Sequence, residues 1–110
     1  PERNVEIVRK PARYYEMIRM GCLGQVTAMS LTGGFGPGVR GFVEKLLKKR
    51  LIHLIASDAH NVDGRPPGLS LAMREAEKIV RREEAQKMVT VYPKAILEGR
   101  KPHVPDPLPL

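Results

Sequence analysis

The mostly apolar run "LIHLIAS" at residues 51–57 constrains the fold of this chain more than any other feature. It has the length of a strand, and it is typical of a strand buried on both faces of a parallel sheet. Residues 39–49 before it carry apolar side chains at helical spacing, and residues 22–30 have a strand-like pattern. Strand, helix and buried strand in this order predict a βαβ unit.

Further helices are predicted on both sides of this unit. They cover residues 11–20, a stripe from Leu69 to Val80 capped by Ser70, and residues 83–89 and 93–98. Four glycines and a proline among eight residues make 31–38 a loop. The last ten residues contain four prolines and are expected to be extended or disordered.

The predicted unit has too few strands to stand alone. Two strands do not make a stable α/β domain, because their outer edges lack partners. The 110 residues are enough for one small domain at most, so they are expected to form part of a larger α/β fold. An unpaired edge would also allow domain swapping or self-association, which makes a homo-oligomer a candidate assembly.

Charge, cysteine content and hydropathy restrict the binding partners and the cellular location that this chain can have. The net charge of +7 favours anionic partners, namely nucleic acid, phosphorylated substrates or an acidic protein face, without choosing among them. The single cysteine, Cys22, excludes a disulfide framework, and its apolar neighbours predict a buried structural thiol. We expect no membrane insertion and a cytoplasmic location, because no run approaches ~18 apolar residues and no signal-peptide pattern is seen.

Polar residues follow the buried strand directly. Asp58 and His60 share a face if the chain stays extended, and a carboxylate with an imidazole is a common ligand pair for Zn, Mn or Fe. Asn61 and Arg65 follow in the same loop, and the planar guanidinium of arginine matches phosphate. The pattern Asp-x-His is short and also arises by chance, so a turn aspartate and a surface histidine remain an equal alternative.

The two other histidines are expected to have no part in such a site. His53 lies inside the buried strand and His103 in the proline-rich tail. Both are predicted to be structural or incidental.

Four spaced motifs point to one family: "PERN" at 1–4, "GCLGQVTAMSLTGGFG" at 21–36, "LIASDAHNVDGRPPGLSLAMREA" at 54–76 and "YPKAILEGR" at 92–100. Together they resemble the bacterial manganese-dependent tyrosine-protein phosphatases of capsule and exopolysaccharide clusters, which belong to the PHP superfamily. The resemblance covers residues 1–101 and leaves 102–110 as a proline-rich tail. It implies the C-terminal part of a distorted (β/α) PHP-type barrel, with a metal cluster at the carboxyl ends of its strands.

The resemblance also implies the site residues. Asp58 and His60 would be metal ligands, and Arg3 and Arg65 would be catalytic, phosphate-binding arginines. Asn61 would be a further phosphate contact. The implied cofactor is Mn²⁺, with Fe, Co or Zn as alternatives, in a cluster completed by residues outside this chain. In the family, a histidine precedes "PER" and other ligands lie upstream, so the chain alone is expected to be an incomplete, inactive fragment.

The implied activity is hydrolysis of phosphotyrosine in a protein, typically a tyrosine autokinase that controls polysaccharide export. By resemblance, the "RPP" segment favours this activity over a second one, a PHP-type hydrolase of small phosphate esters or nucleic acid ends. A third interpretation is a non-catalytic module that binds an acidic protein. Metal content would separate the third interpretation from the other two.

Overall fold

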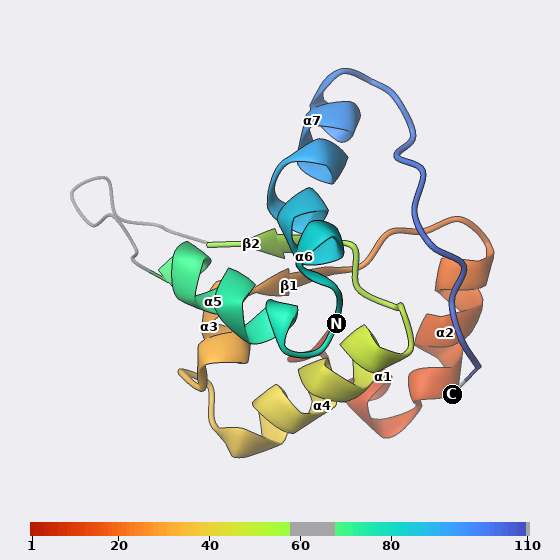
Figure 1. The fold of residues 1–110 in the computed structure, drawn as a ribbon. Coiled ribbons are helices and arrows are strands. Elements are labelled where there is room, and N and C mark those ends of the chain that lie inside the picture. Colours follow the sequence, from red (N-terminus) through yellow and green to blue (C-terminus); the bar gives the residue numbers. More distant parts are fainter. Residues whose placement is uncertain (58–67, 110) are drawn as a thin grey trace.

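Two short parallel strands lie at the centre of the structure, surrounded by helices (Figure 1). The computed structural model describes residues 1–57 and 68–109. Within these ranges, β1 (Gln25–Thr27) pairs in parallel with β2 (Leu54–Ala56). Between them the chain passes through α4 (Pro37–Lys48), a helix that the sequence pattern predicts. The βαβ unit and the α/β fold class are therefore confirmed.

Most of the remaining helices also agree with the sequence pattern. They are α2 (Pro11–Arg19), α5 (Gly68–Glu77), α6 (Arg82–Val89) and α7 (Val91–Leu97). Helix α5 begins before Ser70, so the prediction of Ser70 as its cap is wrong. Helix α1 (Val5–Arg9) is not predicted, because five residues are too few to show helical periodicity. Asn4 caps this helix, and its Oδ1 accepts the N–H of Ile7 at 3.1 Å.

The strand predicted at 22–30 is much shorter in the structure. It ends at Thr27, and the next residues form α3 (Ala28–Thr32). Gly33, with φ of +93°, ends this helix, so only residues 33–36 remain of the loop predicted at 31–38. Ala28 is buried in this helix, and the short helix has too few residues to show helical spacing. The alternating pattern of apolar and polar residues therefore placed the end of the predicted strand at residue 30, three residues beyond its end in the structure.

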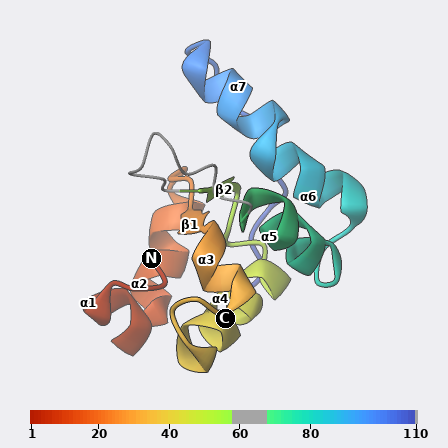
Figure 2. The same ribbon diagram turned by 90° about the vertical axis from the view of Figure 1, so that its left-hand side faces the viewer.

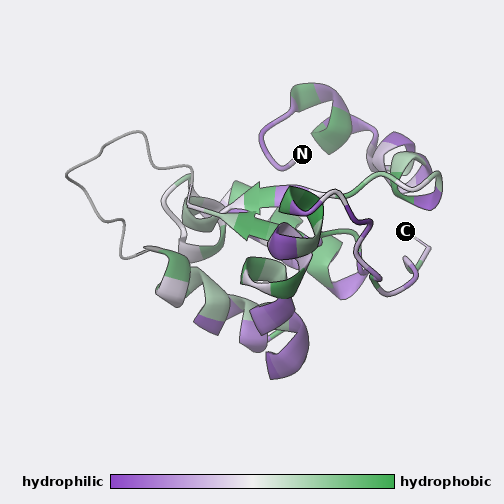
Figure 3. Cartoon of the chain, turned by 90° about the horizontal axis from the view of Figure 1, so that it is seen from above, coloured by the Kyte–Doolittle hydropathy of each residue, from purple (hydrophilic) through white to green (hydrophobic). Residues whose placement is uncertain are grey.

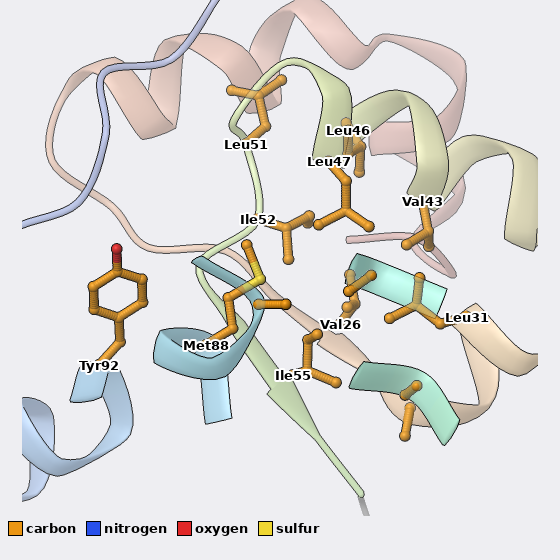
Figure 4. Close-up of a cluster of buried hydrophobic side chains, with 14 of the residues drawn as sticks. Val26, Leu31, Val43, Leu46, Leu47, Leu51, Ile52, Ile55, Met88 and Tyr92 are labelled. Atoms are coloured by element: carbon orange, nitrogen blue, oxygen red, sulfur yellow. The ribbon is translucent and has the colours of Figure 1, made fainter. Parts of the chain in front are cut away.

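Buried aliphatic side chains from the strands and helices form one core (Figure 4). Val26 of β1 and Ile55 of β2 are partners in the strand register, and both point into this cluster. Leu46 and Leu47 of α4 and Met88 of α6 pack around them. Burying each such side chain contributes about 1.5–3 kcal/mol. Viewed from above, hydrophobic residues lie on the central strands, and the surrounding helices have both hydrophobic and hydrophilic turns (Figure 3).

Burial of the second strand is less complete than its apolar run predicts. Ile55 is buried, whereas Leu54 and Ala56 are half-buried. The residues just before β2 are the most deeply buried part of the run, with Leu51, Ile52 and His53 at most 2% exposed. Burial on both faces is thus confirmed only in part.

Gly24 and His53 hold the amino-terminal ends of the two strands together. The N–H of His53 donates to the Gly24 carbonyl oxygen at 2.8 Å, and the N–H of Gly24 donates to His53 Nδ1 at 2.9 Å. From α2, the hydroxyl of Tyr14 donates to the Leu51 carbonyl oxygen at 2.6 Å. A Cβ at Gly24 would collide with the Tyr14 hydroxyl. His53 is therefore structural, as predicted.

Residues after α7 run extended along the molecule, as the proline content predicts. Helix α7 lies on the opposite side of the strands from α1 and α4, and the following residues return toward α2 (Figures 1 and 2). Pro102 is buried, and the N–H of Leu108 donates to the Lys49 carbonyl oxygen at 2.8 Å. None of the helices in the described ranges has the length and apolar character needed to span a membrane.

Replacement of Gly24 by alanine is expected to lower the free energy of unfolding by about 1–3 kcal/mol, because the added methyl group displaces Tyr14 from Leu51. Gly41→Ala, in the interior of α4 with open space around it, is the control and should stabilise by about 0.5–1 kcal/mol. Urea unfolding measures both changes. Equal effects at the two positions would contradict the close approach at Gly24.

Stability is expected to fall as the pH drops from about 6.5 to about 4, because burial lowers the pKa of His53 to about 4. In that range the unfolded chain binds a proton at His53 and the folded chain does not. His53→Asn keeps an acceptor for the Gly24 N–H but cannot titrate, so its unfolding free energy should depend less on pH. His103→Asn, at an exposed position, should keep the wild-type dependence. Chemical unfolding at several pH values tests this.

Candidate active site

The carboxyl ends of the two strands define the candidate site, since ligands of α/β folds bind at this edge. The strand register pairs Thr27 with Ala56, so both strands end side by side. Four of the predicted site residues, Asp58, His60, Asn61 and Arg65, lie outside the described residues. Their roles therefore stay predictions. In the sequence, these four residues lie between the end of β2 and the start of α5.

A buried glutamate, Glu2, joins the start of the chain to this edge. Its side chain is among the few buried charged groups in the described ranges, with 6% exposure. Its Oε2 accepts the N–H of Thr27 at 3.2 Å, at the last residue of β1. A carboxylate bound to a backbone N–H makes a charge-assisted hydrogen bond, which is stronger than a neutral one. Glu2 therefore anchors residues 1–4 beside the strand ends.

The next residue, Arg3, is the one predicted site residue that the structure describes. Its side chain is exposed, and its guanidinium carbon lies 4.2 Å from the centroid of the Phe35 ring. This is cation–π geometry, which holds the planar group over the ring. A guanidinium stacked in this way keeps N–H donors along its edge, where a phosphate can bind in bidentate fashion.

Phe35 belongs to the glycine-rich loop between α3 and α4. Gly33 and Gly36 in this loop have φ values of +93° and +94°, so glycine is required there for backbone reasons. The same loop also brings Phe35 to Arg3. In this loop the glycines therefore form the turn, and Phe35 contacts the arginine.

A groove of about 570 Å³ opens beside Arg3, between α1 and α4. Its lining residues are Glu2, Arg3, Val5, Val8, Arg9, Phe35, Gly38, Val39 and Phe42. The groove is thus mainly apolar, with two arginines at its rim. Sequence patterns did not reveal it, because it requires α1, which periodicity does not detect.

Cys22 comes before the amino-terminal end of β1 and is not part of this edge. Cys22 is exposed, so the prediction of a buried thiol is wrong. It follows Gly21 in the turn that ends α2, where its N–H donates to the Met17 carbonyl oxygen at 3.1 Å. That turn lies on the surface even though its sequence neighbours are apolar.

In the described part of the chain, no group of three or more His, Cys, Asp or Glu residues could hold a metal ion.

Glu2 itself was missed by the sequence analysis, which attached significance only to the arginine of "PERN". A charged residue between proline and arginine carries no local signal of burial. Its partner, Thr27, is 25 residues away, and only the tertiary structure brings the two together.

The fold and this edge define a class: an α/β protein in which Glu2 is bonded to the end of β1 and the next residue, Arg3, is exposed and stacked on Phe35. The family model "Capsular polysaccharide synthesis, CpsB/CapC" matches residues 1–98. The chain belongs to this family.

Similar proteins are named tyrosine phosphatases. The chain is 45% identical over 65 residues to tyrosine-protein phosphatase YwqE from Bacillus subtilis (strain 168), covering 59% of this chain and 26% of that relative. It is 30% identical over 104 residues to tyrosine-protein phosphatase CpsB from Streptococcus pneumoniae, covering 87% and 42%. The match spans less than half the length of each of these relatives.

A solved structure has the same fold over the whole chain. It comes from the crystal structures of YwqE from Bacillus subtilis and CpsB from Streptococcus pneumoniae, described as unique metal-dependent tyrosine phosphatases. The TM-score is 0.88 at 34% sequence identity, and the match covers 100% of this chain and 44% of that one. This likeness confirms the family resemblance drawn from the motifs.

Loss of the Glu2 carboxylate is expected to free the Thr27 N–H. In Glu2→Ala, hydrogen exchange at the Thr27 amide should accelerate, and the unfolding free energy should fall by about 1–3 kcal/mol. Glu2→Gln keeps an oxygen acceptor and should retain most of the protection. The exposed Glu6→Ala on α1 is the matched control. Unchanged exchange in Glu2→Ala would rule out the anchoring role.

Proposed function

We propose that this chain takes part in the metal-dependent hydrolysis of phosphotyrosine in proteins. The observation that carries the proposal is Arg3, an exposed guanidinium stacked on Phe35 at the edge to which Glu2 is bonded. Membership of the capsular polysaccharide synthesis family and likeness to proteins named tyrosine-protein phosphatases support it. Because the chain spans less than half of these relatives, the activity is proposed for the protein that contains this chain.

In this proposal Arg3 and Arg65 hold the phosphoryl oxygens and neutralise charge that develops as the ester bond breaks. Asp58 and His60 hold the metal, and Asn61 is a further phosphate contact. These residues suit Mn²⁺, and also Fe, Co or Zn, because carboxylate and imidazole donors bind such ions. Further ligands would come from residues outside this chain. When bound, the metal supplies Lewis-acid activation of water and phosphate.

The proposed substrate is a phosphotyrosine protein, and a tyrosine autokinase of polysaccharide export is the inferred one. This inference follows the motif resemblance and fits a family of capsular polysaccharide synthesis. The reaction would take place in the cytoplasm. An unpaired strand edge would also let two copies of the protein associate.

Phosphotyrosine peptide hydrolysis by the protein expressed from its complete reading frame tests the proposal. We expect turnover with Mn²⁺ that a chelator abolishes. His60→Ala should lower kcat/KM by about 10²-fold or more, through loss of a metal ligand. Arg3→Lys should also lower it about 10²-fold, because an ammonium cannot reproduce bidentate binding. His103→Ala in the exposed tail is the control and should keep wild-type turnover.

The other results would each select a different function. Hydrolysis of small phosphate esters or nucleic acid ends without hydrolysis of phosphotyrosine would indicate another phosphoesterase. A protein that binds no metal under these conditions would indicate a non-catalytic binding module. Full activity in His60→Ala would remove this histidine from the site.

A further inference from the structure

The groove between α1 and α4 continues directly from the candidate phosphate-binding residue. Arg3 and Phe35 are part of its lining, and so are Val5 and Val8 of α1. A ligand whose phosphate is bound by Arg3 therefore has this groove as its neighbouring surface. Its volume of about 570 Å³ is within the range of ligand-binding pockets, ~300–1,000 Å³.

Apolar side chains are exposed along one wall of the groove. Val5 is 69% and Val8 45% exposed. They are three residues apart in a helix, so they lie on the same face. On the opposite wall are Val39 and Phe42 of α4, which are half-buried. Together they make a contiguous apolar surface with charged residues beside it, which is the kind of patch that binds another molecule.

Charge on the groove favours an anionic occupant. Among its lining residues the cations are Arg3 and Arg9, and the carboxylate of the third charged residue, Glu2, accepts the N–H of Thr27. An apolar groove with arginines at its rim suits a peptide with a phosphate beside apolar residues. Phosphotyrosine with an apolar neighbour in the chain has this chemistry.

We propose that the groove binds the peptide segment adjoining phosphotyrosine in the substrate protein and selects an apolar side chain there. This rests on the proposed function, and it adds a preference for particular flanking residues. Phosphate at Arg3 and an apolar side chain between Val8 and Phe42 would be bound together. Burial of one aliphatic side chain there corresponds to about a 10-fold gain in affinity.

Two peptides with a non-hydrolysable phosphonate in place of phosphotyrosine test the preference, one flanked by leucine and one by serine. Fluorescence anisotropy is measured with the protein from its complete reading frame. We expect the leucine-flanked peptide to bind about 10-fold more tightly. Val8→Glu should remove this preference. Leu97→Glu on α7, where the side chain is 88% exposed and outside the groove, should keep it.

Equal binding of the two peptides by the wild type, or an intact preference in Val8→Glu, would overturn the proposal. So would a loss of stability or a changed oligomeric state in Val8→Glu but not in Leu97→Glu, because the groove would then be covered by the protein itself or by a second copy. Hydrolysis of a phosphotyrosine peptide by the wild type is measured in parallel. Its absence in the presence of metal contradicts the proposed function, while the peptide preference is decided by binding alone.

Discussion

Gly24 allows three segments to meet more closely than any side chain would permit. The Tyr14 hydroxyl reaches the Leu51 carbonyl oxygen beside it, and Gly24 and His53 bond to each other in both directions. These bonds lie just before β1 and β2 and set the strand register. A slip by one residue would turn the strand side chains to the opposite face. The apolar core and the position of both strand ends therefore depend on this contact.

At the other end of the strands, the same register places the ends of β1 and β2 side by side at the candidate site. Thr27 is the last residue of β1, and the bond from its N–H to Glu2 brings the start of the chain to this edge. Arg3 then stacks on Phe35. Arginine has several flexible torsions, and contact with the ring reduces the conformations open to the guanidinium. A buried carboxylate and an aromatic ring thus fix the position of one exposed guanidinium beside the strand ends.

Long periodic segments were the predictable part of this structure. Helix α4 and the parallel pairing of its flanking strands follow from spacing, because burial of one helix face requires apolar residues at fixed intervals. Short elements were not predictable in this way. Helices α1 and α3 have five residues each, so α1 was missed, and α3 was divided between a predicted strand and a predicted loop. Cys22 was misplaced because apolar neighbours in sequence do not determine burial within a turn.

The sequence by itself determined the class of fold, the family and the identity of the candidate groups, since these depend on residue order and motif spacing. The predicted roles of Asp58, His60, Asn61 and Arg65 still rest on that evidence. Tertiary structure decided which distant groups meet. Glu2 reaches Thr27, and Arg3 reaches Phe35, only after folding closes the loops between them. Such contacts depend on the packing of intervening elements, which leaves no periodic signal in the chain.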